Sequence, residues 1–376
     1  MHVLMISPSF YPIEGGTETM VQNISTAIKD LGVEVDIMTF NMDQKWHPRW
    51  SGAVENRNNL KIFKIPGFNW LPFINHSPRI TSKLNVIPGR FTHMLKEYDV
   101  LHFHEAEFSF PFFSFFVKKR KILHLHAIDF DYFNRYHFSR LLLKNTVDMY
   151  LSLTNKMKEE LIALGVAEQK INVLPNAIDT KIFQSGGKKN ENTLLYVGRI
   201  VPEKGLHVLL RSLKYVNHSV TLTIIGPSGW DLNYCQNIFR LIEIENQRGK
   251  HVIQYIGGFA PNHPELIAQY QQASIFILPS FREAFGVVLL EAMACETPVI
   301  ATQTGGVPEI VRNGENGILV SVNNYIELAR AIDYLLDNED IRLKLGKQAC
   351  AMVKESYSID VVANRLYDIY QKIICA

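Results

Sequence analysis

Cysteine and long apolar runs are scarce in this sequence. Its four cysteines, Cys235, Cys295, Cys350 and Cys375, are widely separated and form no C-x-x-C pair, so a disulfide framework is excluded and a reducing cytoplasm fits best. No segment reaches the ~18 consecutive apolar residues of a membrane span. The N-terminal run M-H-V-L-M-I-S-P also lacks the basic leader of a signal peptide. We therefore expect a cytoplasmic protein without a transmembrane segment.

Excess charge is small as well. The formal net charge is +2, with 20% charged and 47% hydrophobic residues, whereas a dedicated nucleic-acid binder usually has a strongly basic face. We expect no nucleic-acid partner, although local patches could still bind acidic small molecules or lipid headgroups. At 376 residues the chain exceeds one ordinary core and suits two domains of ~150–200 residues each.

A third absence concerns dinucleotide cofactors. The sequence contains no G-x-G-x-x-G fingerprint, so a nicotinamide cofactor is poorly supported. The pair Gly15 and Gly16 instead lies between a strand-like N-terminus and a helical pattern. It would allow a close backbone approach and leave amides free to face a phosphate or a sugar. A plain strand-to-helix turn has the same pattern.

Strand-like apolar runs alternate with helical patterns along the whole chain, which predicts doubly wound α/β domains. In the first half the pattern predicts a helix at Thr17–Leu31 and strands at His2–Ser7, Glu34–Thr39, Lys61–Ile65, Asp99–His104, Lys121–His126 and Asp148–Leu153. In the second half it predicts strands at Leu194–Val197, Leu222–Ile225, Val252–Tyr255, Ile275–Leu278, Pro298–Ala301 and Gly317–Val320.

Two further segments concern the domain organisation. The polar, glycine- and lysine-rich stretch Gln184–Asn192 interrupts the alternation and is interpreted as an interdomain linker. The last segment, Ser358–Ile374, has an amphipathic helical pattern that could pack on either half.

Glu283 and Glu291 frame the run that begins P-S-F-R-E-A-F-G at Pro279. We expect Glu283 where a loop meets a helix and Glu291 two turns inside that helix, about 12 Å away at ~1.5 Å per residue. That distance matches the reach from the sugar to the ribose of a nucleoside-diphospho-sugar. The diphosphate would lie against the free amides of the helix start. A surface helix with two ordinary glutamates is the alternative.

Arg199 and Lys204 follow the first predicted strand of the second half. Sugar transfer from a nucleoside diphosphate builds negative charge on the leaving phosphate, and two cations placed there stabilise the transition state more than the ground state. Arginine offers phosphate oxygens a planar fork and lysine a point charge. A solvated loop with a surface ion pair is the alternative.

Taken together, the motifs of this chain are similar to those of the family-four retaining glycosyltransferases. The resemblance covers most of the chain and is most specific in its second half. It rests on the run G-G-x-E at Gly15, V-G-R-I-V-P-E-K-G at Val197–Gly205, I-I-G-P at Ile224–Pro227, E-A-F-G-V-V-L-L-E at Glu283–Glu291 and T-G-G-V-P-E-I-V at Thr304–Val311.

This resemblance implies the GT-B architecture, in which two Rossmann-like doubly wound domains face each other across a cleft. The N-terminal domain, residues 1–183, would bind mainly the acceptor, and the C-terminal domain, residues 190–357, mainly the nucleotide-sugar. The final helix, residues 358–376, would cross back to the first domain.

The resemblance also implies roles for individual residues. Catalysis would rest on Arg199, Lys204, His126 and Glu283, with His126 contacting the sugar or acceptor and Glu283 the hydroxyls of the donor sugar. Glu291 would grip the ribose, and Phe259 would place the base. The backbone amides of Phe285, Gly286, Val287 and Val288 would hold the diphosphate. The remaining donor-binding positions would be Gly15, Gly16 and Gly198.

Metal ligands are not expected at the transfer site. The cations would do the work of a divalent ion, and the D-x-D string at Asp129–Asp131 falls in the first half, so it is interpreted as a polar loop or acceptor-side feature. His102, His104, His124 and His126 form two H-x-H pairs on what the pattern makes adjacent strands. Such clusters can bind zinc, but buried structural histidines are the favoured interpretation.

Two features depart from, or add to, the family pattern. Glu296 stands where the family usually has glycine; as a left-handed helix cap it would cost roughly 1 kcal/mol. The run Phe108–Lys121 is a phenylalanine-rich segment followed by four cations. It could dock on an anionic membrane that carries a lipid-linked acceptor, which would make the protein peripheral at the inner membrane face; a helix buried against the sheet is favoured.

The sequence thus predicts a retaining glycosyltransferase that moves a hexose to a glycan or lipid-linked acceptor in polysaccharide or glycoconjugate synthesis. The expected donor is a UDP-sugar such as UDP-glucose, and no cofactor is expected. A nucleotide-sugar epimerase or hydrolase on the same fold, a phosphorylase, and a non-catalytic sugar-binding protein are the alternatives. The acceptor depends on loops such as Phe68–Lys83, which match no motif, and neither acceptor nor oligomeric state is specified.

Overall fold

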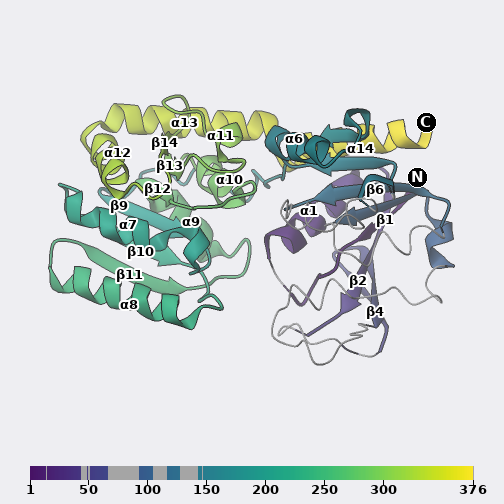
Figure 1. Cartoon of the computed structure of the whole chain (residues 1–376), viewed down its shortest axis with the longest axis horizontal. Helices are drawn as coiled ribbons and strands as arrows, with labels where there is room; N and C mark the ends of the chain where they lie inside the picture. Colours follow the sequence, from purple (N-terminus) through teal and green to yellow (C-terminus); the bar gives the residue numbers. More distant parts are fainter. Residues whose placement is uncertain are drawn as a thin grey trace. The chain divides into compact units, whose positions relative to one another are not determined.

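The chain folds into two compact units. The computed structural model describes residues 1–13, 15–43, 49, 51–66, 93–104, 117–127, 143–145 and 147–375. The first unit comprises Met1–Ala177 and Ile359–Ala376, and the second comprises Ile178–Ser358. Each unit is built on a largely parallel sheet with helices packed against it (Figure 1).

The sheet of the first unit has the strand order β3-β4-β2-β1-β5-β6-β7-β8. All described pairings are parallel except that of β3 with β4. The predicted strands are confirmed, whereas the edge strands β3 and β8 were not predicted. The strands are β1 His2–Ile6, β2 Glu34–Asn41, β3 Ala53–Arg57, β4 Leu60–Pro66, β5 Val100–His104, β6 Arg120–Leu125, β7 Met149–Ser152 and β8 Ile171–Val173.

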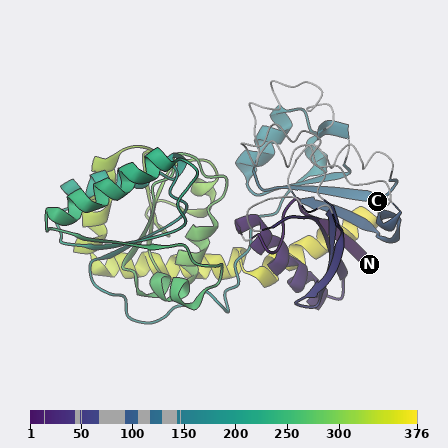
Figure 2. The same ribbon diagram turned by 90° about the horizontal axis from the view of Figure 1, so that it is seen from below.

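The last helix of the chain belongs to the first unit. Helix α14 (Ile359–Cys375) lies beside α1 (Gly16–Asp30), as Figure 2 shows, and the two share one buried apolar cluster with the sheet. Val362, Leu366 and Tyr370 of α14 are fully buried there. The amphipathic pattern of the C-terminal segment thus reflects its packing on the N-terminal sheet. The other described helices of this unit are η2 Met94–Glu97, α6 Asn155–Ala163 and η3 Glu168–Lys170.

The sheet of the second unit has the order β11-β10-β9-β12-β13-β14, with every pairing parallel. This is the doubly wound order in which the chain reverses direction beside its first strand, here between β9 and β12. All six strands were predicted within two residues at each end. They are β9 Thr193–Val197, β10 Thr221–Ile225, β11 Val252–Gly257, β12 Ile275–Leu278, β13 Val299–Thr302 and β14 Ile318–Val320.

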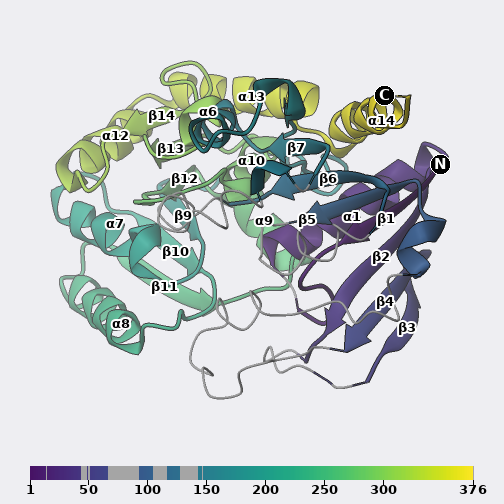
Figure 3. The same cartoon turned by 45° about the vertical axis from the view of Figure 1, so that its right-hand side comes forward.

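Helices cover both faces of this second sheet. The buried residues of α7, α8 and α12 form one apolar cluster with β9 and β10, and Figure 3 shows these three helices along one side of the strands. Helix α10 packs against α9 and α13, and it also contacts strands β12 and β13 of the sheet. The bounds are η4 Pro202–Lys204, α7 Leu206–Ser212, η5 Leu213–Tyr215, α8 Leu232–Gln247, α9 Pro264–Gln272, α10 Val287–Ala294, α11 Val307–Ile310, α12 Tyr325–Asp337 and α13 Glu339–Ser356.

The interpretation of Gln184–Asn192 as an interdomain linker is wrong. This stretch lies wholly inside the second unit, where the Lys189 Nζ donates to the Cys295 carbonyl oxygen at 2.8 Å and to the Thr297 Oγ1 at 2.6 Å. Burial lowers the pKa of Lys189 to about 8. A polar composition suggested a free segment, but the Lys189 contacts and hydrogen bonds at Gln184 and Asn190 fix it to the second unit.

Several sequence interpretations lie outside the described residues. These are the loop Phe68–Lys83, the D-x-D string Asp129–Asp131 and all but the end of the run Phe108–Lys121. Within the part of the chain that the structure describes, no helix combines the length and apolarity that crossing a membrane requires.

Glu296 ends α10 in the left-handed conformation that was expected at this position, with a φ of 56°. The Glu296 amide bonds to the Met293 carbonyl and the Thr297 amide to the Ala292 carbonyl, each at 3.0 Å. This pair of bonds is the Schellman arrangement, in which glycine is the favoured residue. Glu296 therefore holds a strained backbone, since its Cβ crowds the carbonyl oxygen in this conformation.

We expect the substitution Glu296→Gly to raise the free energy of unfolding by about 1 kcal/mol, because it relieves this left-handed strain. Urea unfolding followed by circular dichroism measures the change. Glu296→Ala is the matched control, since it also removes the Ser185 hydrogen bond of the glutamate side chain but keeps a Cβ. Equal stability of the glycine and alanine variants would contradict the strain argument.

Candidate active site

The candidate site lies at the carboxyl ends of β9 and β12. These strands are neighbours in the sheet, and β9 pairs with β10 on its other side. Because the chain leaves β9 and β12 in opposite directions, the loops after these strands diverge and open a position between them. Parallel α/β sheets bind ligands at this position.

The loop after β9 carries the two predicted cations. Gly198 and Arg199 follow the strand directly, and Lys204 closes the short helix η4. The Tyr196 hydroxyl donates to the Arg199 carbonyl oxygen at 3.1 Å, which fixes the backbone of the loop. The Arg199 side chain is exposed, and its guanidinium carbon lies 5.2 Å from the centre of the Trp230 ring. Among the described residues, the partner of the Arg199 guanidinium is thus an aromatic face and not a carboxylate.

Glu283, from the loop after β12, meets Lys204 directly. The Lys204 Nζ and the Glu283 Oε2 lie 2.6 Å apart, with side chains only 21% and 11% exposed. At this burial the pair is screened much less than a surface ion pair. The structure thus brings two of the predicted residues, 79 positions apart in the chain, into one charged contact.

Close backbone contacts hold these loops together. A Cβ on Gly205 would overlap the Pro279 carbonyl oxygen, and one on Gly305 would overlap the Glu283 carbonyl oxygen. Both glycines also have positive φ angles, 68° and 54°. The Gly306 amide then donates to the Glu283 carbonyl at 3.1 Å. Glycine is needed at both positions because only hydrogen fits between the two backbones.

The start of α10 differs from the sequence prediction in one respect. The helix begins at Val287, so Glu283 lies four residues before it and the helical rise between Glu283 and Glu291 does not apply. Gly286 is the N-cap, with a φ of 98° and no side-chain capping bond. The amides of Val287 and Val288 in the first turn have no intrahelical acceptor. Phe285 is buried against Tyr357, so only its backbone is available to a ligand.

Glu291 lies one turn into α10 and is partly buried. Its Oε2 accepts a hydrogen bond of 2.6 Å from the Tyr270 hydroxyl on α9. Burial raises the pKa of Glu291 to about 7, and the Tyr270 hydrogen bond opposes the rise. Burial and the nearby Glu291 charge raise the pKa of Tyr270 far above its usual value, so Tyr270 stays protonated and acts as the donor.

Phe259 follows β11 at the same edge of the sheet. Its ring is stacked on His263, with 4.9 Å between ring centres. His263 in turn accepts a hydrogen bond from the Glu265 amide at the start of α9. The stacking thus gives the Phe259 ring a partner within its own loop.

The remaining predicted residues belong to the first unit. Gly15 is the N-cap of α1 with an extended backbone, and a Cβ on it would meet only the flexible Glu18 side chain. Gly16 has open space where a Cβ would stand. Neither glycine is required by the fold, because neither has a positive φ. The space above Gly16 is the feature that a bound ligand could use.

His126 follows β6 and is buried. Its Nε2 lies 3.0 Å from the Nδ1 of His104. Burial lowers the pKa of His126 to about 4, so the ring is neutral at physiological pH and one of the two nitrogens in this contact carries the proton. His126 can therefore donate or accept one hydrogen bond, but it does not supply a positive charge.

A cavity of about 560 Å³ lies elsewhere, at the N-terminal ends of β5, β6 and β7. The predicted site residues follow the carboxyl ends of their strands, so we do not assign this cavity to the candidate site. Half of its lining residues are basic, and the full lining is Asp99, Lys118, Lys119, Arg120, Lys121, Asn145, Val147, Asp148, Lys170 and Ile374.

Sequence reasoning missed three residues that position the site: Tyr196, Trp230 and Tyr270. Tyr196 supports the backbone of Arg199, Trp230 faces its guanidinium group, and Tyr270 holds Glu291. Tyr196 is part of a predicted strand, and its role depends only on the direction of one hydroxyl. Trp230 and Tyr270 lie in segments without a motif, so no sequence signal pointed to them.

Two family models match consecutive parts of the chain. Glycosyltransferase Family 4 matches residues 14–182, and Glycosyl transferases group 1 matches residues 177–352. Together they cover most of both units. The match to the second model includes every candidate residue of the β9, β11 and β12 loops.

Relatives and solved structures agree with these models. A glycosyltransferase of Methanocaldococcus jannaschii, named as uncharacterized, is 24% identical over 99% of this chain and 98% of its own. The capsular polysaccharide biosynthesis glycosyltransferase CapM of Staphylococcus aureus is 27% identical over 64% of this chain and 66% of its own. Among solved structures, HepE of Anabaena in complex with UDP and glucose has a TM-score of 0.79 and 16% identity, over 98% of this chain and 99% of its own.

The two parallel-sheet units match the GT-B fold of such structures, and the family models and relatives are those of sugar-transferring enzymes. The chain therefore belongs to the family-four glycosyltransferases, glycosyl transferases group 1, and is a glycosyltransferase of the GT-B architecture.

Proposed function

We propose that this glycosyltransferase moves a hexose from a UDP-sugar to a glycan or lipid-linked acceptor, with retention of the anomeric configuration. The observation that carries the proposal is the Lys204–Glu283 contact at the switch point of the second sheet, beside the exposed Arg199 and the first turn of α10. This arrangement puts cations, free amides and a carboxylate at the edge where a nucleoside-diphospho-sugar would bind.

The diphosphate has three sets of donors available in this proposal. The first turn of α10 offers backbone amides at the positive end of the helix dipole. Lys204 is already oriented by Glu283, and a diphosphate would share its charge. Arg199 faces the Trp230 ring, and no carboxylate among the described residues would have to be displaced before it binds phosphate. These cations would stabilise the charge that develops on the leaving group.

Carboxylates would bind the two ends of the donor. Glu283 would accept hydrogen bonds from hydroxyls of the sugar, and its charge is kept in place by Lys204. Glu291 would accept from the ribose hydroxyls, with the Tyr270 hydroxyl fixing its second oxygen. Phe259 would contact the base through its backbone. In the first unit, Gly15, Gly16 and His126 would meet the transferred sugar or the acceptor.

The transfer itself would follow a front-face route, in which the departing phosphate takes the proton of the acceptor hydroxyl. No sequence motif identifies an Asp or Glu that would act as a covalent nucleophile. We propose no divalent metal at the diphosphate, because Arg199 and Lys204 would neutralise the charge that such an ion usually neutralises. The resemblance to HepE, a protein solved with UDP and glucose, supports a UDP-sugar. The relative CapM, named for capsular polysaccharide biosynthesis, supports a glycan product.

A donor panel tests this function. We expect UDP-sugars to raise the melting temperature by mass action more than GDP- or ADP-sugars at equal concentration, and to be hydrolysed slowly without an acceptor. Added Mg²⁺ or Mn²⁺ should leave both effects unchanged. Stabilisation by none of the nucleotide-sugars would refute the function, and a requirement for Mg²⁺ would refute the role given to the cations.

We expect Arg199→Ala and Lys204→Ala each to lower kcat by ~10²–10³-fold, the usual loss when one donor to a developing charge is removed. The physical reason is that each cation meets charge that forms in the transition state. Initial-rate kinetics with circular dichroism as a fold check measure it. Arg240→Ala, an exposed arginine on α8, is the matched control; unchanged turnover in the Arg199→Ala variant would remove that residue from catalysis.

Nucleotide affinity should depend on pH through Glu291. The ionised carboxylate accepts both ribose hydroxyls, so affinity should fall as pH drops through about 7, the pKa of this group. For folding the sign is opposite: the raised pKa stabilises the folded protein at acid pH, and this contribution is lost as pH rises through about 7. Calorimetric titration with UDP-glucose measures the affinity, because its diphosphate is substituted at both ends and does not titrate in this pH range, unlike the terminal phosphate of UDP. In Glu291→Gln the pH dependence should be flat; a slope equal to wild type would contradict the assignment.

A further inference from the structure

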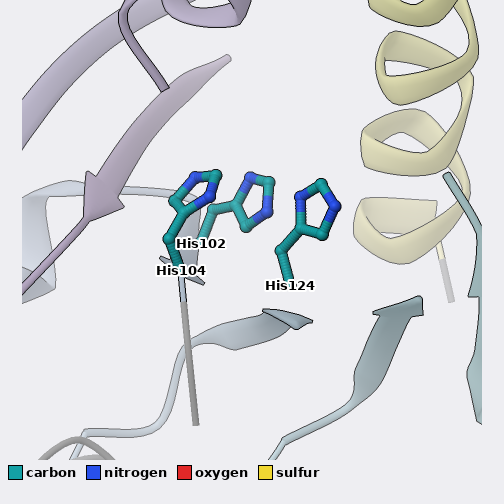
Figure 4. A group of neighbouring side chains, drawn as sticks. All are labelled: His102, His104 and His124. Atoms are coloured by element: carbon teal, nitrogen blue, oxygen red, sulfur yellow. The ribbon is translucent and has the colours of Figure 1, made fainter. Parts of the chain in front are cut away.

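Three histidines of the first unit come together between two neighbouring strands. His102 and His104 lie on β5 and His124 on β6, and the register of these strands pairs His104 with His124. Figure 4 shows the three rings side by side. One ring nitrogen from each lies within 4.8 Å of those of the other two. Among the described residues this is the group of side chains whose spacing suits a metal ion.

The three rings are completely buried, and their hydrogen bonds are incomplete. His102, His104 and His124 have no exposed surface. Within the part of the chain that the structure describes, the Nε2 atoms of His102 and His104 and both ring nitrogens of His124 have no hydrogen-bond partner. The contact between the Leu174 backbone and His124 does not have the distance and angle of a hydrogen bond. Buried polar groups are nearly always paired in native proteins, so this concentration of unpaired nitrogens in one place requires an explanation.

The nitrogens that do have partners form a pattern. The Nδ1 of His102 lies 2.6 Å from the Tyr370 hydroxyl, and the Nδ1 of His104 lies 3.0 Å from the Nε2 of His126. In both rings a protein group therefore holds Nδ1 and leaves Nε2 unpaired. Histidines that bind metals have this arrangement, since the partner fixes the ring and its tautomer while the other nitrogen binds the ion.

Ring packing gives no alternative explanation of the unpaired nitrogens. Stacking of the rings, with centres 4.3 Å apart for His102 and His104, accounts for their packing but leaves the unpaired nitrogens unexplained.

We propose that His102, His104 and His124 form a binding site for a transition-metal ion of the Zn²⁺ class, which ties β5 and β6 to α14 through Tyr370. Zinc ions commonly have three histidine ligands and a fourth from water or another group. An all-imidazole set suits Zn²⁺, Cu²⁺, Ni²⁺ or Co²⁺ and disfavours Mg²⁺ and Ca²⁺, which prefer oxygen. This inference does not rest on the proposed function.

Binding would require a small rearrangement. Nitrogen ligands of tetrahedral zinc lie about 3.4 Å from one another, given bonds of about 2.1 Å, whereas the separation here reaches 4.8 Å. The rings of His102 and His124 are also nearly parallel, with 10° between their planes. Rotation about the side-chain bonds would tilt the nitrogens toward a common centre, and the strand backbones can stay where they are.

Metal analysis of the full-length protein tests the proposal. Mass spectrometry gives the metal content of the protein as isolated. Unfolding in denaturant with a chelator removes any bound metal, and refolding in the presence of Zn²⁺ or Co²⁺ then gives the stoichiometry of binding. We expect one equivalent of metal, a rise in melting temperature, and a Co²⁺ absorption spectrum of the tetrahedral type. A wild-type protein that takes up neither ion after refolding would overturn the proposal.

Variants locate the site. His124→Phe keeps an aromatic ring and should lose the bound metal, whereas His93→Asn, at an exposed histidine of the same unit, should keep it. Tyr370→Phe removes only the hydroxyl that holds His102 and should weaken the affinity by ~10–100-fold. Wild-type affinity in a folded His124→Phe variant would overturn the site. If that variant fails to fold, Tyr370→Phe decides: affinity equal to wild type would overturn the proposal.

Discussion

The close approach of three backbone loops at the carboxyl edge of the second sheet is the constraint on which the candidate site depends. Gly205 lies against the Pro279 carbonyl and Gly305 against the Glu283 carbonyl, with no room for a Cβ at either place. The Phe281 amide bonds across to the Glu203 carbonyl at 2.8 Å. Because these contacts fix the backbones, the Lys204 and Glu283 side chains are already within contact distance of each other.

Three charged groups at this edge are held in different ways before any ligand binds. Lys204 is paired with Glu283, whereas Glu291 has a raised pKa and accepts a hydrogen bond from a protonated tyrosine. Arg199 faces an aromatic ring. This arrangement leaves Arg199 and the helix amides available to an anion, which is the electrostatic basis of the proposed donor site.

Much of the fold could be predicted because buried parallel strands are continuous apolar runs. The strands of both sheets were found in this way, and only the edge strands β3 and β8 were missed. The linker interpretation failed because composition cannot show that Lys189 reaches buried acceptors. The helical spacing of Glu283 and Glu291 failed because Gly286, with its positive φ, delays the start of α10. Glu296 was identified correctly, since a left-handed cap is a local property of the chain.

The sequence by itself determined the alternation of strands and helices and the order of the motifs, because these depend on local periodicity and on the chain itself. The need for glycine at 205 and 305 came from tertiary contacts, since distant backbone carbonyls leave no room for a Cβ there. Only the tertiary structure decided which side chains meet. Lys204 reaches Glu283 and Tyr270 reaches Glu291 through strand order and helix packing. The two H-x-H pairs became one cluster because the register of β5 and β6 sets His104 opposite His124. Tyr370, 268 residues from His102, joins them because α14 packs on the N-terminal sheet.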